Sequence, residues 1–136
     1  MTKFGITGTR SALTNVQIAA ITKFLAENFV EGCELHHGDC VGADAHVAQI
    51  AKDLGYKIVC HPPVESGLRA FFASDETRQP LTYFARNRNI VNETEFLIVA
   101  PYQNEWQSKG GTWYTHDYAK KKGKQLCVFY PIGVEP

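Results

Sequence analysis

Three glycine-containing turns carry the side chains and backbone amides best suited to holding an anion. The first, Thr7-Gly8-Thr9-Arg10, combines a glycine that lets the backbone approach a ligand with two hydroxyls and a planar arginine cation. The second, residues 38–44, carries Asp39 and Asp44, which suit ribose hydroxyls better than phosphate. The third, Gly110-Gly111-Thr112, places free amides at the start of a helix, where phosphate binds well.

These turns, together with the pair Arg86-Asn87, define a candidate ligand site. Glycine at a strand-to-helix turn also serves geometry alone, and Asp44 in a first helical turn also favours the helix dipole. Neither the dinucleotide fingerprint GxGxxG nor the P-loop GxxxxGK(S/T) occurs, which disfavours standard NAD binding and ATP hydrolysis. The candidate ligand-binding residues are Gly8, Thr9, Arg10, Gly38, Asp39, Gly42, Asp44, Arg86, Asn87, Gly110, Gly111 and Thr112.

Strand-like and helix-like patterns alternate along the whole chain. Short apolar runs predict strands, and apolar residues that recur every three or four positions predict helices. Thr14, followed by Gln17 three residues later, fits a capping box at the start of the first helix. We expect strands at 4–7, 33–37, 56–60, 95–100 and 125–130, and helices from Thr14 to before Gly32, from Ala43 to before Gly55, and over 83–92 and 113–122.

This alternation predicts one α/β domain over residues 1–136, with a three-layer Rossmann-like fold. Right-handed crossovers place parallel strands side by side with helices on both faces, here around a mainly parallel sheet of about five strands. Ligands of such sheets bind beyond the carboxyl ends of the strands, where all three turns belong. Residues 62–82 have no regular pattern, so we expect either a lid over a ligand or a surface excursion with one short helix.

Composition and charge narrow the range of partners. Lys+Arg number 14 and so do Asp+Glu, whereas proteins that bind a nucleic-acid backbone usually carry a basic excess, so nucleic acid is disfavoured. The sequence has no membrane span or signal peptide pattern and four scattered cysteines, so we expect a cytoplasmic protein with no membrane partner. A homodimer is compatible with a small Rossmann-like domain.

The pattern of histidines and cysteines disfavours a metal site. Several of these residues lie near the ends of the second and third expected strands, but their spacing fits no standard zinc pattern. We therefore expect no metal ligands and no cofactor. The residues in question are His36, His37, Cys40, Cys60 and His61.

The same turns carry a resemblance to a known group of proteins. The chain resembles the SLOG superfamily, which includes the DprA/Smf and LOG-type proteins, and is most similar to its small YspA/YpsA-related members. The resemblance covers nearly the whole chain. It rests on Ile6–Arg10, Gly38–Asp44, Arg86-Asn87 ahead of the strand 96–101, Lys109–Thr112 and the helix-strand unit 118–131.

The resemblance implies a Rossmann-like domain that binds nucleotides or nucleotide-derived ligands. In the LOG branch it also implies hydrolysis of the N-glycosidic bond of nucleoside monophosphates, through an arginine before the fourth strand and a glutamate in a PGGxGTxxE motif. Arg86 matches that arginine, whereas Thr115 stands in place of the glutamate, and an extra loop separates Pro101 from Gly110.

We name Arg86 and His116 as candidate catalytic residues. Histidine is the residue type best suited to proton transfer near neutral pH, which makes His116 a candidate. Its alternative role is that of an ordinary solvated helix residue. Four aromatic residues near the third turn are candidates to stack on a base, or alternatively to anchor the loop or fill the core: Tyr102, Trp106, Trp113 and Tyr114.

Two functions therefore follow, and a third competes with them. The first is a sensor or carrier that binds a nucleotide or nucleotide-derived ligand at the carboxyl edge of the sheet. The alternative is an N-glycosidase, similar to phosphoribohydrolases, that acts on nucleoside monophosphates or nucleotide sugars. A DprA-like single-strand DNA binder is disfavoured by the neutral charge and by the lack of an obvious basic stripe.

Overall fold

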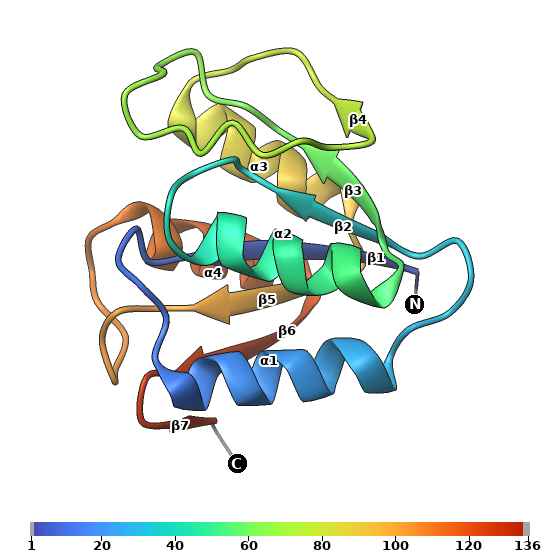
Figure 1. Cartoon of the computed structure of the whole chain (residues 1–136). Helices are drawn as coiled ribbons and strands as arrows, with labels where there is room; N and C mark the ends of the chain where they lie inside the picture. The colour runs from blue at the N-terminus through green and yellow to red at the C-terminus, as the bar shows by residue number, and fades with distance from the viewer. Residues whose placement is uncertain (1, 135–136) are drawn as a thin grey trace.

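The computed structural model describes residues 2–134 and alternates strands and helices along its length (Figure 1). The four helices begin and end close to where their apolar spacing predicts. They are α1 (Asn15–Glu27), α2 (Ala43–Leu54), α3 (Tyr83–Glu93) and α4 (Gly111–Lys121). The strands are β1 (Lys3–Gly8), β2 (Glu34–His37), β3 (Lys57–Cys60), β4 (Glu76–Thr77), β5 (Phe96–Ala100), β6 (Gln125–Tyr130) and β7 (Gly133–Val134).

The strands form one sheet in the order β4-β3-β2-β1-β5-β6-β7. All neighbouring pairs are parallel except β6 with β7, which is a short antiparallel addition. From β1 the chain first builds outward through β2 and β3, and then returns to the other side of β1 with β5. The strand order therefore reverses at β1, and the predicted Rossmann-like fold is confirmed, with two short strands beyond the five expected.

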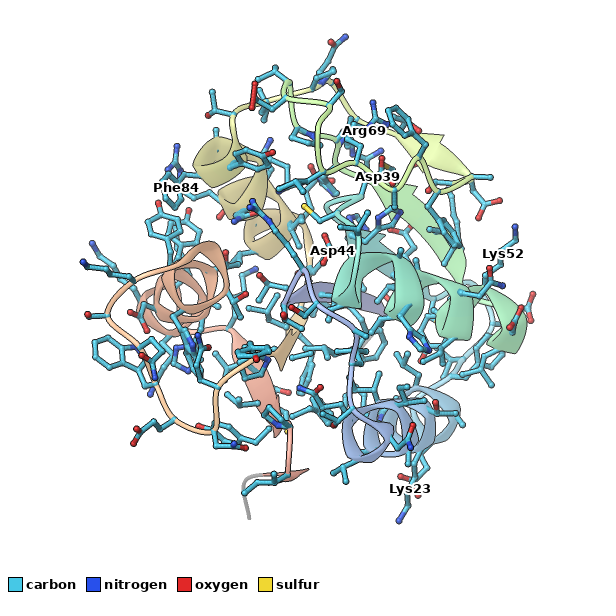
Figure 2. All side chains as sticks on the ribbon, turned by 60° about the vertical axis from the view of Figure 1, so that its left-hand side comes forward. Lys23, Asp39, Asp44, Lys52, Arg69 and Phe84 are labelled. Carbon is cyan, nitrogen blue, oxygen red and sulfur yellow. The ribbon has the colours of Figure 1, made fainter. Side chains whose placement is uncertain are left out.

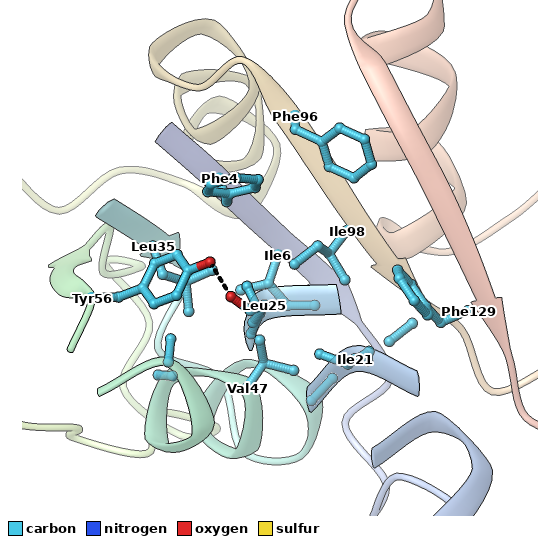
Figure 3. Close-up of a cluster of buried hydrophobic side chains, with 14 of the residues drawn as sticks. Phe4, Ile6, Ile21, Leu25, Leu35, Val47, Tyr56, Phe96, Ile98 and Phe129 are labelled. Carbon is cyan, nitrogen blue, oxygen red and sulfur yellow. Dashed lines mark hydrogen bonds between the residues drawn. The ribbon is translucent and has the colours of Figure 1, made fainter. Parts of the chain in front are cut away.

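Helices cover both faces of the sheet and give three layers (Figure 1). Helices α1 and α2 lie against one face over the larger apolar core, which includes Phe4, Leu25 and Tyr56. Helices α3 and α4 cover the other face around Ile90 and Trp113. Figure 3 shows the larger core, in which the Tyr56 hydroxyl donates a hydrogen bond of 2.7 Å to the carbonyl of Leu25.

The start of α1 is fastened to the carboxyl edge of the sheet. The predicted capping box is present: the Thr14 hydroxyl accepts from the Gln17 amide, and the Gln17 side chain accepts from the Thr14 amide. The Gln17 side-chain nitrogen then donates to the carbonyls of Pro101 and Phe129, at 2.8 and 2.9 Å. One buried amide thus joins α1 to the ends of β5 and β6.

Residues 62–82 form a surface excursion that is attached to the sheet. The segment contributes strand β4 beside β3, and it does not contain the short helix that the surface-excursion alternative included. Ahead of this strand in the chain, the Ala70 amide donates to the carbonyl of Asp39, and the Val41 amide donates to the carbonyl of Leu68. These bonds fix the segment over the end of β2.

The structure bears on two features that we considered in the sequence, membrane-spanning helices and the cysteines. Among residues 2–134, no helix is both long and apolar enough to span a membrane. All four cysteines are free thiols: Cys33, Cys40 and Cys60 are buried, and Cys127 is half-buried.

We expect Gln17→Ala to lower the free energy of unfolding by about 2–3 kcal/mol, because two buried carbonyls lose their donor and the helix loses its capping box. Urea denaturation followed by circular dichroism measures the change. Gln49→Ala, on the exposed face of α2, is the matched control and is expected to change stability by less than about 0.5 kcal/mol. Equal effects of the two substitutions would contradict this role of Gln17.

Candidate functional site

A cavity of about 440 Å³ opens at the carboxyl edge of the sheet, next to the point where the strand order reverses. Figure 2 looks onto this edge, with Asp44 near the centre of the view and Phe84 at the outside of α3. The first and third predicted turns line the cavity over their whole length. The second turn contributes only Cys40 and Asp44. The predicted ligand-binding residues that line it are Gly8, Thr9, Arg10, Asp44, Arg86, Asn87, Gly110, Gly111 and Thr112.

The first turn brings β1 and α2 close together. A Cβ on Gly8 would lie 2.6 Å from both the carbonyl oxygen of Ala100 and the Cβ of Ala43, so only glycine fits here. The Thr9 amide donates to Ala100, and the Thr9 carbonyl accepts from the amide of Ala43. Arg10 follows with an exposed side chain, whose guanidinium lies 5.1 Å from the ring centre of Tyr83.

The third turn presents the amino terminus of α4 to the cavity. Gly110 adopts a φ of 100°, which favours glycine, and no side chain caps the helix. The first helical hydrogen bond runs from the amide of Tyr114 to the carbonyl of Gly110. The amides of Gly111, Thr112 and Trp113 precede that bond, as orphan donors at the positive end of the helix dipole. An anion at this point gains both hydrogen bonds and a favourable field.

Arg86 is buried and joins α3 to the ends of two strands. Its Nη1 donates to the carbonyl of Gly38, directly after β2, and to the carbonyl of His61 at 3.1 Å, directly after β3. Its Nε donates to the side-chain oxygen of Asn87 at 2.6 Å. Its Nη2 has a weak contact of 3.6 Å with the sulfur of Cys40. Arg86 therefore holds the ends of β2 and β3 through Nη1, which is a structural role. The same residue also forms part of the cavity wall.

Asp44 is the one carboxylate among the residues that line this cavity in the described part of the chain. Its Oδ2 accepts from the amides of Gly38 and Cys40, at 3.0 and 3.3 Å. Burial raises the pKa of Asp44 to about 6, against the opposing effect of the Arg86 cation. Near neutral pH this carboxyl group is therefore able to exchange a proton.

The thiol of Cys40 also lines the cavity. Burial raises the pKa of this thiol. The group therefore stays protonated near neutral pH, which disfavours a role as a thiolate nucleophile.

Three predicted binding residues of the second turn do not line the cavity: Gly38, Asp39 and Gly42. Asp39 is fully buried at a φ of 59°, and its carboxylate accepts from Arg69 Nε and from the amide of Phe72, each at 2.8 Å. Its oxygens thus hold the 62–82 segment. Gly38 and Gly42 serve close packing instead, since a Cβ on either would come within 2.5 Å of neighbouring atoms.

His116, the second candidate catalytic residue, also does not line the cavity. Its Nδ1 lies 2.8 Å from a carboxylate oxygen of Asp117, and its ring packs edge-on against Trp113. Thr115 is buried, and its hydroxyl donates to the carbonyl of Gly111 at 2.7 Å. It therefore supports the first turn of α4.

The buried histidines form hydrogen-bonded clusters beneath the site. His36 Nδ1 lies 2.8 Å from His61 Nε2, and His36 Nε2 lies 2.8 Å from a carboxylate oxygen of Glu34. His37 accepts from the amide of Asp39 and contacts the hydroxyl of Ser74. Burial lowers the pKa of His37 to about 4 and that of His61 to about 3, so both rings are neutral at pH 7.

Potential metal ligands within these clusters already have other partners. The groups His36, His61, Glu93 and His37, Asp39, Cys60 each bring three ligand atoms within 4.8 Å of one another. Most of those atoms are engaged in the hydrogen bonds described above or, for Glu93, in an ion pair with Arg78. Burial also raises the pKa of Cys60 to about 12. A bound ion would have to displace these partners.

Tyr83 belongs to the site, although we did not predict it from the sequence. Two cations lie near its ring: the guanidinium of Arg10 is 5.1 Å from the ring centre, and that of Arg86 is 5.5 Å from it. It begins α3 three residues before Arg86, so one helical turn places both side chains on the same face. That spacing was the available signal. Trp113 and Tyr102 also line the cavity, Trp113 buried and Tyr102 exposed.

The chain shares its fold with several solved proteins, although neither a protein-family model nor a curated protein sequence matches it. The molybdenum cofactor binding protein of the phototrophic bacterium Rippkaea orientalis superposes with a TM-score of 0.72 at 21% identity, over 94% of this chain and 76% of that one. The molybdenum cofactor carrier protein of Chlamydomonas reinhardtii gives 0.65 at 17% identity, over 93% and 74%.

DNA processing protein A of Streptococcus pneumoniae gives a TM-score of 0.68 at 17% identity, over 94% of this chain and 50% of that one. The present chain therefore spans half the length of that protein. At such identities the likeness establishes a common fold. The narrower similarity to the YspA/YpsA-related group stays a prediction.

The raised pKa of Asp44 predicts a specific pH dependence of stability. Its folded pKa of about 6 exceeds the unfolded value of 3.8, so this group's contribution is fully present below pH 4 and is lost as the pH rises through 6. We expect the unfolding free energy of the wild type, minus that of Asp44→Asn, to fall by about 2–3 kcal/mol between pH 4 and pH 7. Denaturant titrations at both pH values measure it.

The comparison with Asp44→Asn also serves as the control for other titrations. The three buried histidines ionise in both proteins, so their effect on stability cancels in the difference. A difference that stays constant with pH, or rises, would show that Asp44 is ionised as an ordinary surface acid is.

Proposed function

We propose that this protein binds a nucleotide or nucleotide-derived ligand at the carboxyl edge of its sheet, as a sensor or carrier. The observation that carries the proposal is the convergence of Arg10, Arg86 and the orphan amides of 111–113 on one cavity with a single carboxylate. Such a cavity is positive where a phosphate would lie, and aromatic where a base or other planar ring would lie.

The size and lining of the cavity support a small ligand. Its volume of about 440 Å³ falls within the range of about 300–1,000 Å³ typical of small-molecule sites. Tyr83 and Tyr102 offer ring faces, and Gln103 and Asn87 offer amides for polar groups of a base or sugar. We assign the phosphate to the start of α4 and the sugar to the region between Thr9 and Asp44.

The proteins that share the fold support a ligand of this class. Two of them are named for binding or carrying the molybdenum cofactor, and one for DNA processing. The balanced charge of this chain favours the small-ligand role over the nucleic-acid role. A cytoplasmic location and a homodimer stay predictions from the sequence.

We expect Arg10→Ala to weaken the binding of AMP or another bound mononucleotide by about tenfold or more, since a charge-assisted contact to phosphate is lost. Isothermal titration calorimetry measures the affinity. Lys23→Ala, an exposed cation on α1 that does not line the cavity (Figure 2), is the control and leaves the affinity unchanged. If no member of a panel of nucleotides and nucleotide sugars binds, the proposal is wrong.

One observation favours the N-glycosidase alternative. Asp44 lies in the cavity wall beside Arg86, with a pKa of about 6. A carboxyl group of this kind takes a proton from an attacking water, or gives one to a departing base nitrogen, near neutral pH. This would assign the proton transfer to Asp44, because His116 lies outside the cavity.

If the protein is a hydrolase, chromatography should detect free base released from a nucleoside monophosphate. We expect Asp44→Asn to lower the rate by at least about 100-fold, the typical contribution of a positioned acid or base, while the nucleotide still binds. His116→Gln, outside the cavity, should leave the rate within about twofold. Bound ligand that is recovered intact across a broad panel would reject the enzyme and leave the sensor or carrier.

A further inference from the structure

A second hollow, of about 540 Å³, lies beside the first cavity along α4. The two share Phe84, Lys109 and Gly110 in their walls, so they meet at the amino terminus of the helix. Orphan amides at that terminus therefore face a junction between two spaces. A phosphate bound there would lie between them.

The wall of the second hollow is aromatic and held in place. The ring centres of Phe84 and Tyr114 lie 4.5 Å apart, and the ring planes meet at an angle of 56°. The Tyr114 hydroxyl accepts from Arg88 Nη1 at 2.9 Å, and the Tyr118 hydroxyl donates to the side-chain oxygen of Asn92 at 2.9 Å. Both tyrosines are thereby fixed to α3 by their polar ends. Their rings keep one orientation without any ligand, which lowers the entropy cost of stacking.

Phe84 is 52% exposed, although it is a large apolar ring on a helix (Figure 2). This exposed ring favours a ligand with a planar ring, and the charges around the hollow favour an anionic one. Lys109 and Lys121 lie in its wall. Its acid, Asp117, already accepts from the indole nitrogen of Trp106 at 3.0 Å.

We propose that the second hollow is a ring-binding subsite, and that the ligand of this protein contains two ring systems joined through phosphate, as in a dinucleotide. One nucleoside occupies the first cavity, the phosphates lie on the amides after Gly110, and the second ring stacks on Phe84 and Tyr114. This inference rests on the proposed function, because it extends the ligand of the same site.

Two ligands that differ only in the second ring test it. Diadenosine diphosphate and ADP-ribose share an adenosine, a pyrophosphate and a second ribose, and only the former carries a second adenine. Calorimetry on the full chain is expected to show at least about tenfold tighter binding of diadenosine diphosphate, the range of one stacked base. Tyr114→Ala, which changes a residue of the second hollow alone, should remove most of this preference while keeping the affinity for ADP-ribose. Phe84→Ala should also lower the ratio of the two affinities.

Tyr102→Ala is the matched control, because this exposed tyrosine lines the first cavity and not the second. It is expected to leave the ratio of the two affinities unchanged. Equal affinities for the two ligands in the wild type would overturn the subsite and leave the proposed function standing, provided that ADP-ribose or AMP binds. If none of the three binds, and no other member of the panel of nucleotides and nucleotide sugars binds, both proposals are wrong.

A second copy of the chain on the hollow would give a different result. Sedimentation would then show a dimer that Phe84→Ala dissociates, with no change in the ratio of affinities. That outcome overturns the subsite in favour of an interface.

Discussion

A single guanidinium, that of Arg86, sets the arrangement of the carboxyl edge. A buried cation is costly unless its donors are satisfied, and here they reach the carbonyls that follow β2 and β3. Helix α3 is thus held against β2 and β3, neither of which is its direct neighbour in the sequence. This cation also lies near enough to Asp44 to oppose the rise that burial causes in the pKa of that carboxyl group. Helix α2, on the opposite face of the sheet, is thereby linked to the same point.

Several features of the edge follow from that constraint. Gly38 has to be glycine, since a Cβ there would lie 2.5 Å from Arg86 Nη1. Asn87 turns its oxygen to the guanidinium, which leaves its side-chain nitrogen facing Gly111. Tyr83, one helical turn earlier, covers the cation with its ring. Anchoring α3 therefore also shapes the wall that faces the start of α4, where the proposed phosphate binds.

The alternation of strands and helices could be predicted because it depends on local patterns. Strands buried on both faces read as apolar runs, such as Phe96–Ala100, and the capping box at Thr14 needs only neighbours in sequence. The turns at the carboxyl edge followed from the topology of parallel sheets. The common location of Gly8, Arg10 and Gly110–Thr112 is therefore predictable from the order of the elements, and all of these residues line the cavity.

What could not be predicted depends on contacts distant in sequence. Asp39 and Asp44 stand five residues apart and look equivalent, but Asp39 turns inward because Arg69 and Phe72 reach it from the 62–82 segment. Strand β4 forms by adding two residues to the edge of β3, and so short a strand leaves no pattern. His116 looked reactive by type, whereas the rotation of α4 packs it against Trp113 and Asp117.

The most direct test of the proposed site is an amide titration by nuclear magnetic resonance, which suits a chain of 15.2 kDa. AMP added to ¹⁵N-labelled protein is predicted to shift the amides of Gly111, Thr112 and Trp113 in a saturable way, together with those of Thr9 and Arg10. The amides around Lys23 on α1 should stay in place. If the amides at the start of α4 do not move while others saturate, or if none moves with any nucleotide, the central claim is contradicted.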